Sequence, residues 1–304
     1  MVAQKMDDQF KILLADDGSD HAEAARRLVE GLPLLAGSEI TVLRAFTSTQ
    51  VSDLAPLESA LNSTCALLRE KGLQAKPELR LGSPAEKVVE YAEEQKPDLI
   101  VMGAKGLRAT FGILLGGVAQ QVVEYACCPV LVVRAPYHGL RRILLVTDGS
   151  PSSQQAVQYL GSLPLPSEAK VEVMHVLPPA PIQMILENTT FGSMQVATPE
   201  QVLEVEAVLR AKEERDGQAL LDATVASLPG GLAASGVLKR GDAATEIIDY
   251  VKAHEIDMIV TGSRGLGQIQ SWLMGSVSRK LVHYSGCSVL VVRSVEKKHD
   301  SPKT

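Results

Sequence analysis

The sequence contains few aromatic residues and no concentrated basic stretch. Aromatic side chains make up 4% of the 304 residues, with a single tryptophan, and the Lys and Arg residues are dispersed in a chain of formal net charge −6. Affinity for nucleic acid rests largely on a basic surface that neutralises phosphates, often with aromatic rings that stack on bases. Because both features are missing, direct binding of nucleic acid is disfavoured.

Cysteine is also scarce. The four cysteines, Cys65, Cys127, Cys128 and Cys287, show no metal-ligand spacing, and no two histidines stand four residues apart. A zinc site is therefore not expected. Cys127 and Cys128 are adjacent and just precede a predicted strand, and we interpret them as small apolar side chains buried in the core rather than as a redox pair.

Long apolar runs are missing as well. No run approaches the length of about 18 residues that a membrane-spanning helix needs. Residues 1–10 are polar and include two aspartates, unlike a signal peptide. We therefore expect a cytoplasmic protein without membrane contact. Its apolar and charged fractions of 45% and 22% are those of a globular protein, and its length suffices for two domains.

What the sequence does contain is an internal repeat. Leu99–Arg134 and Met258–Arg293 align without gaps and are identical at 16 of 36 positions. The starts of the two halves match too, with KILLADDGS from Lys11 against RILLVTDGS from Arg142. Such self-similarity indicates a duplicated domain. Proline and glycine interrupt the pattern over residues 135–139, which predicts domains at residues 1–137 and 138–304.

Short apolar runs alternate with helical patterns in both halves. For the first half this predicts strands at residues 11–15, 40–46, 77–81, 99–102 and 130–133, and helices at 20–32, 54–71, 84–95 and 117–125. Continuous apolar runs such as Val130–Val133 are typical of parallel strands buried on both faces. The predicted fold class is α/β, with a five-stranded parallel sheet and helices on both faces in each domain.

The second half carries 28 extra residues between its second strand, at 171–176, and its third, near 237–239. The excess includes an irregular, proline-containing insertion at about residues 178–199, before a predicted helix over 200–228. Loops longer than about 15 residues are usually either functional or without fixed structure. A lid over a ligand and a plain surface loop both fit, and we favour the surface loop.

The stretch Thr261–Ser278, TGSRGLGQIQSWLMGSVS, combines a strand end, a glycine loop and a helix start. The apolar run Met258–Val260 leads into Gly262 and Gly265, and after nine further residues Gly275-Ser276 opens a helical pattern. Glycines allow the backbone to approach a ligand, and unpaired N–H groups at a helix start attract anions. The pattern predicts a phosphate-binding site.

This spacing of glycines resembles the nucleotide-binding signature of the universal stress protein family, and the likeness extends over nearly the whole chain. The resemblance implies two tandem Rossmann-like domains of the adenine nucleotide alpha hydrolase-like type, a role in stress response, and ATP as the ligand. Ligands of open parallel sheets lie at the carboxyl ends of the strands, which brings Asp148 beside the Gly262 loop. The ATP-binding residues predicted for the second domain are Val146, Thr147, Asp148, Val176, Thr261, Gly262, Arg264, Gly265, Gly275, Ser276, Val277 and Ser278.

The chemistry of these side chains divides the site in two. A carboxylate can accept a hydrogen bond from a base or a ribose but repels phosphate, so Asp148 suits the nucleoside end. Ser276 and Ser278 can donate hydroxyl bonds at the phosphate end. Arg264 is either a charge partner of the triphosphate or an exposed loop residue, and both interpretations stay open. Mg²⁺ would be held through the phosphates, without protein side chains as ligands.

The turn after the first strand of the second domain has a structural interpretation as well. Asp148-Gly149-Ser150 followed by Pro151 is typical of a turn and a helix cap, with Ser150 at the N-cap and proline at the first helical position. This role and a role at the nucleoside are compatible.

The first domain departs from the signature at the phosphate end. The residues predicted for its weak or vestigial site are Asp17, Gly103, Gly106, Gly116 and Gly117. Gly117 and Ala119 replace Ser276 and Ser278, Lys105 replaces Arg264, and Asp16 in place of Thr147 adds a carboxylate. Two lost hydroxyl bonds to a charged ligand, at about 1.5–3 kcal/mol each, would weaken binding by roughly two to four orders of magnitude.

Two functions from different classes are compatible with these features. The leading hypothesis is an ATP-binding stress-response protein that senses or signals through nucleotide occupancy. The alternative is a slow ATPase or another nucleotide-hydrolysing enzyme of the same fold. We assign no catalytic residue, because no general base stands at a suggestive spacing. The sequence also lacks a G-x-x-x-x-G-K-[ST] loop, an S-G-G-x-D-S loop, and a G-x-G-x-x-G motif after either first strand.

The family resemblance also implies how the two domains join. In this family, domains pair through the edge strand that ends in Val-Leu-Val-Val-Arg, which covers an otherwise unpaired sheet edge. Val130–Arg134 and Val289–Arg293 would then pair within one chain. Any homodimer would have to use another surface.

Overall fold

The computed structural model describes residues 9–47, 54–107, 114–179, 199–229, 232–265 and 274–293. The first domain contains β1 (Lys11–Ala15), α1 (Asp20–Glu30), β2 (Glu39–Phe46), α2 (Ala55–Glu70), β3 (Gln74–Leu81), α3 (Pro84–Gln95), β4 (Leu99–Gly103), α4 (Gly117–Tyr125) and β5 (Val130–Val133). The second contains β6 (Arg142–Val146), α5 (Pro151–Ser162), β7 (Lys170–Leu177), α7 (Pro199–Ser227), β8 (Ala233–Arg240), α8 (Ala243–Ala253), β9 (Met258–Gly262), α9 (Ser276–Tyr284) and β10 (Ser288–Val292).

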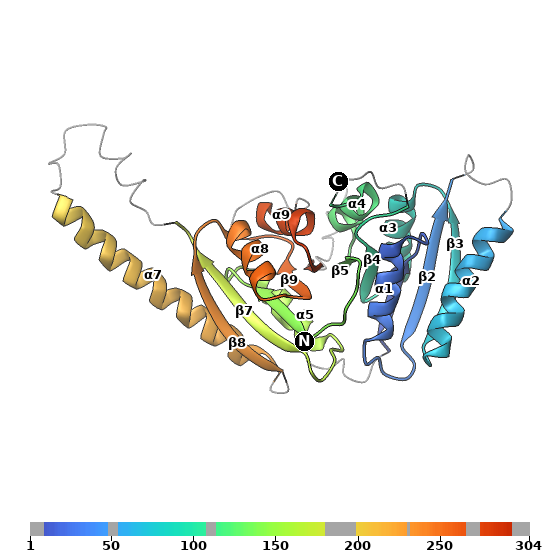
Figure 1. Ribbon diagram of the computed structural model, residues 1–304, viewed down its shortest axis with the longest axis horizontal. Coiled ribbons are helices and arrows are strands. Elements are labelled where there is room, and N and C mark those ends of the chain that lie inside the picture. The colour runs from blue at the N-terminus through green and yellow to red at the C-terminus, as the bar shows by residue number, and fades with distance from the viewer. Residues whose placement is uncertain are drawn as a thin grey trace, which may run out of the picture.

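The strands form one ten-stranded sheet that runs through both domains, in the order β3-β2-β1-β4-β5-β10-β9-β6-β7-β8 (Figure 1). Within each domain all neighbouring strands are parallel. Helices α1, α2, α5 and α7 pack on one face, and α3, α4, α8 and α9 pack on the other. The predicted α/β fold, with a five-stranded parallel sheet covered on both faces in each domain, is confirmed.

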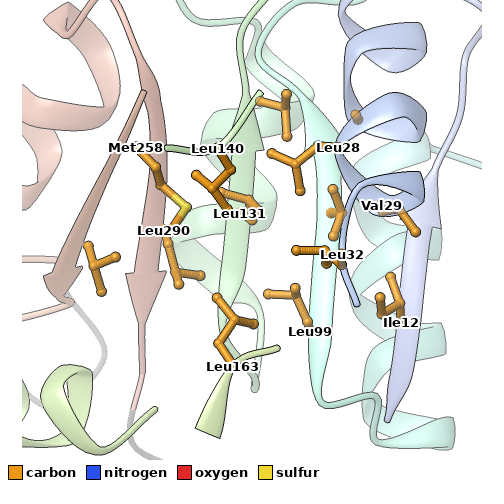
Figure 2. Packing of buried hydrophobic residues seen from close by; sticks show 14 of the residues in the cluster. Ile12, Leu28, Val29, Leu32, Leu99, Leu131, Leu140, Leu163, Met258 and Leu290 are labelled. Carbon is orange, nitrogen blue, oxygen red and sulfur yellow. The ribbon is translucent and has the colours of Figure 1, made fainter. Parts of the chain in front are cut away.

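The two domains join through an antiparallel pair of strands. β5 pairs with β10, with Leu131 opposite Leu290 at the centre. All four side chains of β5 are at most 1% exposed, and the apolar core on the α1 face continues across the join from Leu28 to Met258 (Figure 2). The predicted pairing of Val130–Arg134 with Val289–Arg293 is therefore present within one chain.

Arg134, directly after β5, ties the first domain to the second. Its guanidinium donates hydrogen bonds to the carbonyls of Val282, at 2.8 Å, and His283, at 3.3 Å, near the end of α9, and to the carbonyl of Leu114. Burial lowers the pKa of Arg134 from its ordinary value. Because the Val282 and His283 carbonyls lie at the C-terminal end of α9, they stabilise the cation without a carboxylate.

The third strands are longer than predicted. β3 begins at Gln74 instead of Pro77, with Pro77 inside the strand opposite Val42. Proline lacks an N–H, but β3 lies at the sheet edge and has a neighbour on one side alone, so the missing donor is tolerated. β8 forms the other edge of the sheet. It begins at Ala233, before the predicted 237–239, because Gly236 has no side chain and interrupts the apolar pattern from which a strand is predicted.

The structure corrects the interpretation that Cys127 and Cys128 are both buried. Cys128 is 5% exposed and packs in the core on the α3 and α4 face, whereas Cys127 is exposed.

Helix α7 is the main addition to the second domain. It has 29 residues, against the 16 of α2, and projects beyond the sheet in Figure 1. Its C-terminal half packs on β7 and β8, where Gly217 lies against Leu177 and Leu238. Most of the predicted insertion, residues 180–198, lies outside the described residues, so the choice between lid and surface loop stays a prediction. No helix in the described ranges is both long and apolar enough to cross a membrane.

Candidate functional site

A cavity of about 270 Å³ lies in the second domain at the carboxyl ends of β6, β7 and β9. Its walls come from these strand ends and from the starts of α5, α8 and α9. The residues that line it are Val146, Thr147, Asp148, Ser153, Val176, Ala243, Ile247, Thr261, Gly262, Arg264, Gly265, Gly275, Ser276, Val277 and Ser278. All the ATP-binding residues predicted for this domain are among them; that they bind ATP stays a prediction.

Three residues of the cavity wall were missed by the sequence analysis. Ser153 lies in the first turn of α5, and Ala243 and Ile247 lie four residues apart at the start of α8. A signal existed for the α8 pair, since helices that follow strands in a parallel sheet begin near the same edge as the ligand. Whether these two side chains reach the cavity depends on how α8 packs over the sheet, which the spacing of sequence motifs does not predict.

The turn between β6 and α5 positions Asp148. Gly149 has φ +78°, a left-handed conformation that glycine adopts without strain. The Ser150 N–H donates to Asp148 Oδ1 at 3.0 Å, and the Ser150 side chain accepts from the Ser153 N–H at 3.2 Å. The predicted N-cap at Ser150 with Pro151 behind it is thus confirmed. The bond from the Ser150 N–H fixes Asp148 Oδ1, and Asp148 Oδ2 faces the glycine loop at Gly265.

Gly265 lies against that second oxygen. A Cβ atom at this position would be 2.7 Å from Asp148 Oδ2, too close for a side chain. Gly265 therefore lets the carboxylate and the loop after β9 share the same space. Asp148, which we predict to contact the nucleoside, therefore lies next to the glycine loop, which we predict to contact the phosphates.

Gly262 has a packing role that the sequence analysis did not predict. A Cβ atom there would come within 2.6 Å of the main-chain carbonyl of Ser152 in α5. In the first domain Gly103 is equally close to the backbone of His21, at 2.7 Å. Glycine at this position therefore permits β9 to pack against the first turn of α5. Gly262 also lines the cavity, and its contact with a ligand stays a prediction.

The start of α9 opens onto the cavity. Gly275 is the N-cap and provides no side-chain acceptor, and its own N–H donates to the Ser263 carbonyl at 2.8 Å. The N–H groups of Ser276, Val277 and Ser278 have no partner within the helix, because the first turn of any α-helix lacks them. These donors and the helix dipole create a site for an anion.

The two serines of this turn differ in what they can do. Ser278 is 5% exposed, and its hydroxyl donates to the Gly262 carbonyl at 2.7 Å. This bond stabilises the loop after β9, and Ser278 also lines the cavity; that its hydroxyl donates to phosphate stays a prediction. Ser276 is exposed and lines the cavity. Of the two hydroxyls, that of Ser276 is therefore the more accessible.

The charged residues that line the described part of the cavity are Asp148 and Arg264. The Arg264 N–H donates to Ser152 Oγ at 3.2 Å, which fixes its backbone next to the start of α5. Among the described residues, no group of three or more His, Cys, Asp or Glu side chains could hold a metal ion.

Comparison with known proteins decides the family. The model of the universal stress protein family matches residues 10–134 and again residues 139–293. This chain belongs to the universal stress protein family. The universal stress protein YxiE of Bacillus subtilis is 28% identical over 153 residues, which cover 50% of this chain and 98% of that protein. The two matches show that this is a tandem universal stress protein.

Solved structures agree on the fold. A universal stress protein from Archaeoglobus fulgidus has a TM-score of 0.60 with 19% identity, over 93% of this chain and 98% of its own. A further structure is described as a universal stress protein in complex with cAMP; it covers 41% of this chain and 97% of its own, with 26% identity and a TM-score of 0.35. At 19% identity, the Archaeoglobus fulgidus structure supports the fold alone.

The first universal stress protein domain keeps the backbone frame of the site. Asp17 Oδ1 accepts from the Ser19 N–H at 3.1 Å, and its Oδ2 accepts from the Leu107 N–H at 3.1 Å. A Cβ atom at Gly106 would be 2.4 Å from Asp17 Oδ2, and the Gly116 N–H donates to the Ala104 carbonyl at 2.8 Å. In the described parts of the two loops, the contact of the aspartate with the glycine and the N-cap bond therefore occur in both domains.

The additional carboxylate that the sequence analysis expected at Asp16 is present, and it is paired within the first domain. It is 8% exposed, and its Oδ2 accepts from Arg44 Nη2 at 2.7 Å and from Thr64 Oγ1 at 2.9 Å. The charge is therefore neutralised by residues of β2 and α2. Gly117, Ala119 and Lys105 still differ from Ser276, Ser278 and Arg264 of the second domain.

Proposed function

We propose that the second domain of this universal stress protein binds ATP, and that the chain acts in the stress response by sensing or signalling through nucleotide occupancy. One observation carries the proposal: the first turn of α9, with Gly275 as a side-chain-free N-cap, faces the cavity that Asp148 also lines. A nucleotide needs both features, since its phosphates favour free N–H donors and its nucleoside favours an acceptor.

The phosphate end would combine main-chain and side-chain donors. The N–H groups of Ser276, Val277 and Ser278 and the Ser276 hydroxyl can donate to phosphate oxygens, and Arg264 supplies a positive charge. Hydrogen bonds to an ionised acceptor are about twice as strong as neutral ones. Mg²⁺ would bind to the phosphates and reduce their charge.

The nucleoside end would be formed by apolar walls and one carboxylate. Val146, Val176 and Ile247 line the cavity with hydrocarbon, which suits the faces of a base. Asp148 Oδ1 is engaged by the Ser150 N–H at 3.0 Å, so Asp148 would be held in place before a ligand arrives. The cavity is close to the lower limit of about 300 Å³ for small-molecule sites.

Binding without efficient turnover fits this arrangement better than hydrolysis. A general base must lie within about 2.6–3.2 Å of the water that it activates. Among the described residues of the cavity wall, Asp148 alone carries a carboxylate. The turn after β6 holds this carboxylate in place, at a position that suits contact with the nucleoside rather than activation of a water. Repeated release of phosphate in proportion to protein concentration would instead favour the ATPase alternative.

Exchanging one residue between the domains tests the phosphate end. Ser276→Gly gives the second domain the residue that the first has as Gly117. Loss of one hydroxyl bond to a charged group costs about 1.5–3 kcal/mol, so ATP should bind roughly 10- to 150-fold more weakly. The measurement is a calorimetric titration of nucleotide-stripped protein, with the melting temperature recorded in parallel.

Gly117→Ser is the matched control, since it makes the reverse change in the first domain. We expect it to leave the tight site unaltered. Unchanged ATP affinity in Ser276→Gly, with the fold intact, would mean that the Ser276 hydroxyl donates no hydrogen bond to the phosphates.

A further inference from the structure

Helix α7 contacts the turn that carries Asp148. A Cβ atom at Gly149, the residue after Asp148, would be 3.5 Å from both terminal carbons of Leu220 in the C-terminal half of α7. Apolar groups at this distance are in van der Waals contact, so the Leu220 side chain occupies the space directly beside Gly149. Leu220 does not itself line the cavity. It therefore touches the turn from outside the candidate site.

The same part of α7 packs closely on the sheet. A Cβ atom at Gly217 would be 3.0 Å from Leu238 of β8 and 3.2 Å from His175 of β7. Glycine at this position therefore lets α7 approach both strands more closely than a residue with a side chain would. Leu221, which follows Leu220, is 1% exposed and belongs to the core on the α1 face. These contacts fix where Leu220 lies relative to the sheet.

His175 provides a second link between α7 and the turn. Its Nδ1 lies 2.8 Å from the carbonyl oxygen of Thr147, and because a carbonyl only accepts, the imidazole donates this hydrogen bond. Thr147 directly precedes Asp148 and is 3% exposed. The turn is therefore held on one side by Leu220 and on the other by a β7 side chain that α7 covers.

The first domain holds its corresponding turn with a charged side chain of the sheet. A Cβ atom at Gly18 would be 3.4 Å from Arg44 Nη2, and Arg44 Nε donates to the Asp16 carbonyl at 3.1 Å. Arg44 is the sixth residue of β2, and His175 is the sixth residue of β7. In the second domain an apolar contact with the longer helix has thus taken the place of the arginine.

We propose that Leu220 is a positioning residue for the nucleotide site, through which α7 sets the ATP affinity of the second domain. Leu220 holds the turn in the conformation in which Asp148 Oδ2 faces the glycine loop. A turn that is ordered before the ligand arrives loses less conformational entropy on binding. By thermodynamic linkage, bound ATP must in return stabilise the contact of α7 with the turn. The effect on ATP rests on the proposed function, whereas the effect on the turn does not.

Leu220→Ala removes the contact and leaves the residues that line the cavity unchanged. ATP affinity, measured by calorimetry on the nucleotide-stripped full-length chain, should fall about fivefold or more, since coupled sites typically change affinity by about 5- to 150-fold. Leu220→Met keeps a long apolar side chain and should bind ATP more tightly than Leu220→Ala. Leu209→Ala makes the same change at a leucine of α7 that is 39% exposed, and should bind ATP like the parent protein.

Hydrogen exchange measured by NMR without nucleotide tests the positioning role by itself. The Gly149 N–H donates to Thr147 Oγ1 at 3.3 Å, and it is exposed to exchange when the turn opens. In Leu220→Ala this amide should exchange about fivefold faster or more than in the parent protein. The Gly18 amide, which donates to Asp16 Oδ1 at 2.9 Å in the first domain, should keep its rate and so controls for a general loss of stability.

The two measurements separate the two claims. An unchanged Gly149 exchange rate in folded Leu220→Ala would overturn the proposal, whether or not the chain binds ATP. Faster exchange at Gly149 with unchanged ATP affinity would show that α7 does not set the affinity. If the parent protein binds no ATP, the proposed function fails, and the exchange rates alone decide whether Leu220 positions the turn.

Discussion

Val132→Asp should unfold the protein or separate its two domains. Val132 is 1% exposed in β5, opposite Val289 of β10, and belongs to the core on the α3 and α4 face. An unpaired buried carboxylate costs about 3–5 kcal/mol, and the lost apolar burial adds about 1.5–3 kcal/mol. The sum is comparable to the whole stability of a domain, about 5–15 kcal/mol.

Urea unfolding and small-angle X-ray scattering would measure this effect. Val208→Asp makes the same chemical change at a valine of α7 that is 63% exposed, and should alter stability by no more than about 0.5 kcal/mol. The claim that β5 and β10 hold the two domains together fails if Val132→Asp remains folded with an unchanged scattering profile.

Ser276→Glu should abolish ATP binding and leave the fold intact. It places a carboxylate at the first position of α9, which lines the cavity. At a helix start a carboxylate is stabilising by about 0.3–1 kcal/mol, so the melting temperature without nucleotide should stay the same or rise. A phosphate about 4 Å away would be repelled by about 4 kcal/mol, equivalent to a loss of roughly a thousandfold in affinity.

Gly117→Glu is the matched control, at the corresponding position of α4 in the first domain. We expect it to bind ATP as tightly as the parent protein. Tight ATP binding by folded Ser276→Glu would show that the anion site is elsewhere.

Most of the fold was predictable because its determinants are local. Proline at the helix start and apolar spacing set the bounds of α3 at Pro84–Gln95, and a continuous apolar run set those of β5 at Val130–Val133. The sequence analysis predicted that β3 begins at Pro77, three residues too late, because proline is not expected inside a strand unless that strand is known to lie at a sheet edge. Edge position is a property of the whole sheet, and a local pattern does not contain it.

The composition of the candidate site was more predictable than the roles within it. Motif spacing identified the glycines and serines around the cavity, because they follow one another along the chain. The roles of Gly262 and Ser278 depend on contacts made in three dimensions: Gly262 meets Ser152, more than a hundred residues away, and Ser278 donates to the Gly262 carbonyl. Likewise, the neutralisation of Asp16 by Arg44 depends on the pairing of β1 with β2.

The measurement that tests the central claim most directly is a calorimetric titration of nucleotide-stripped protein with ATP and Mg²⁺, with stoichiometry as the readout. We predict one tight site per chain, which is lost in Ser276→Glu and retained in Gly117→Glu. Two sites of equal affinity would contradict the distinction between the domains, and the absence of binding would contradict the proposed function itself.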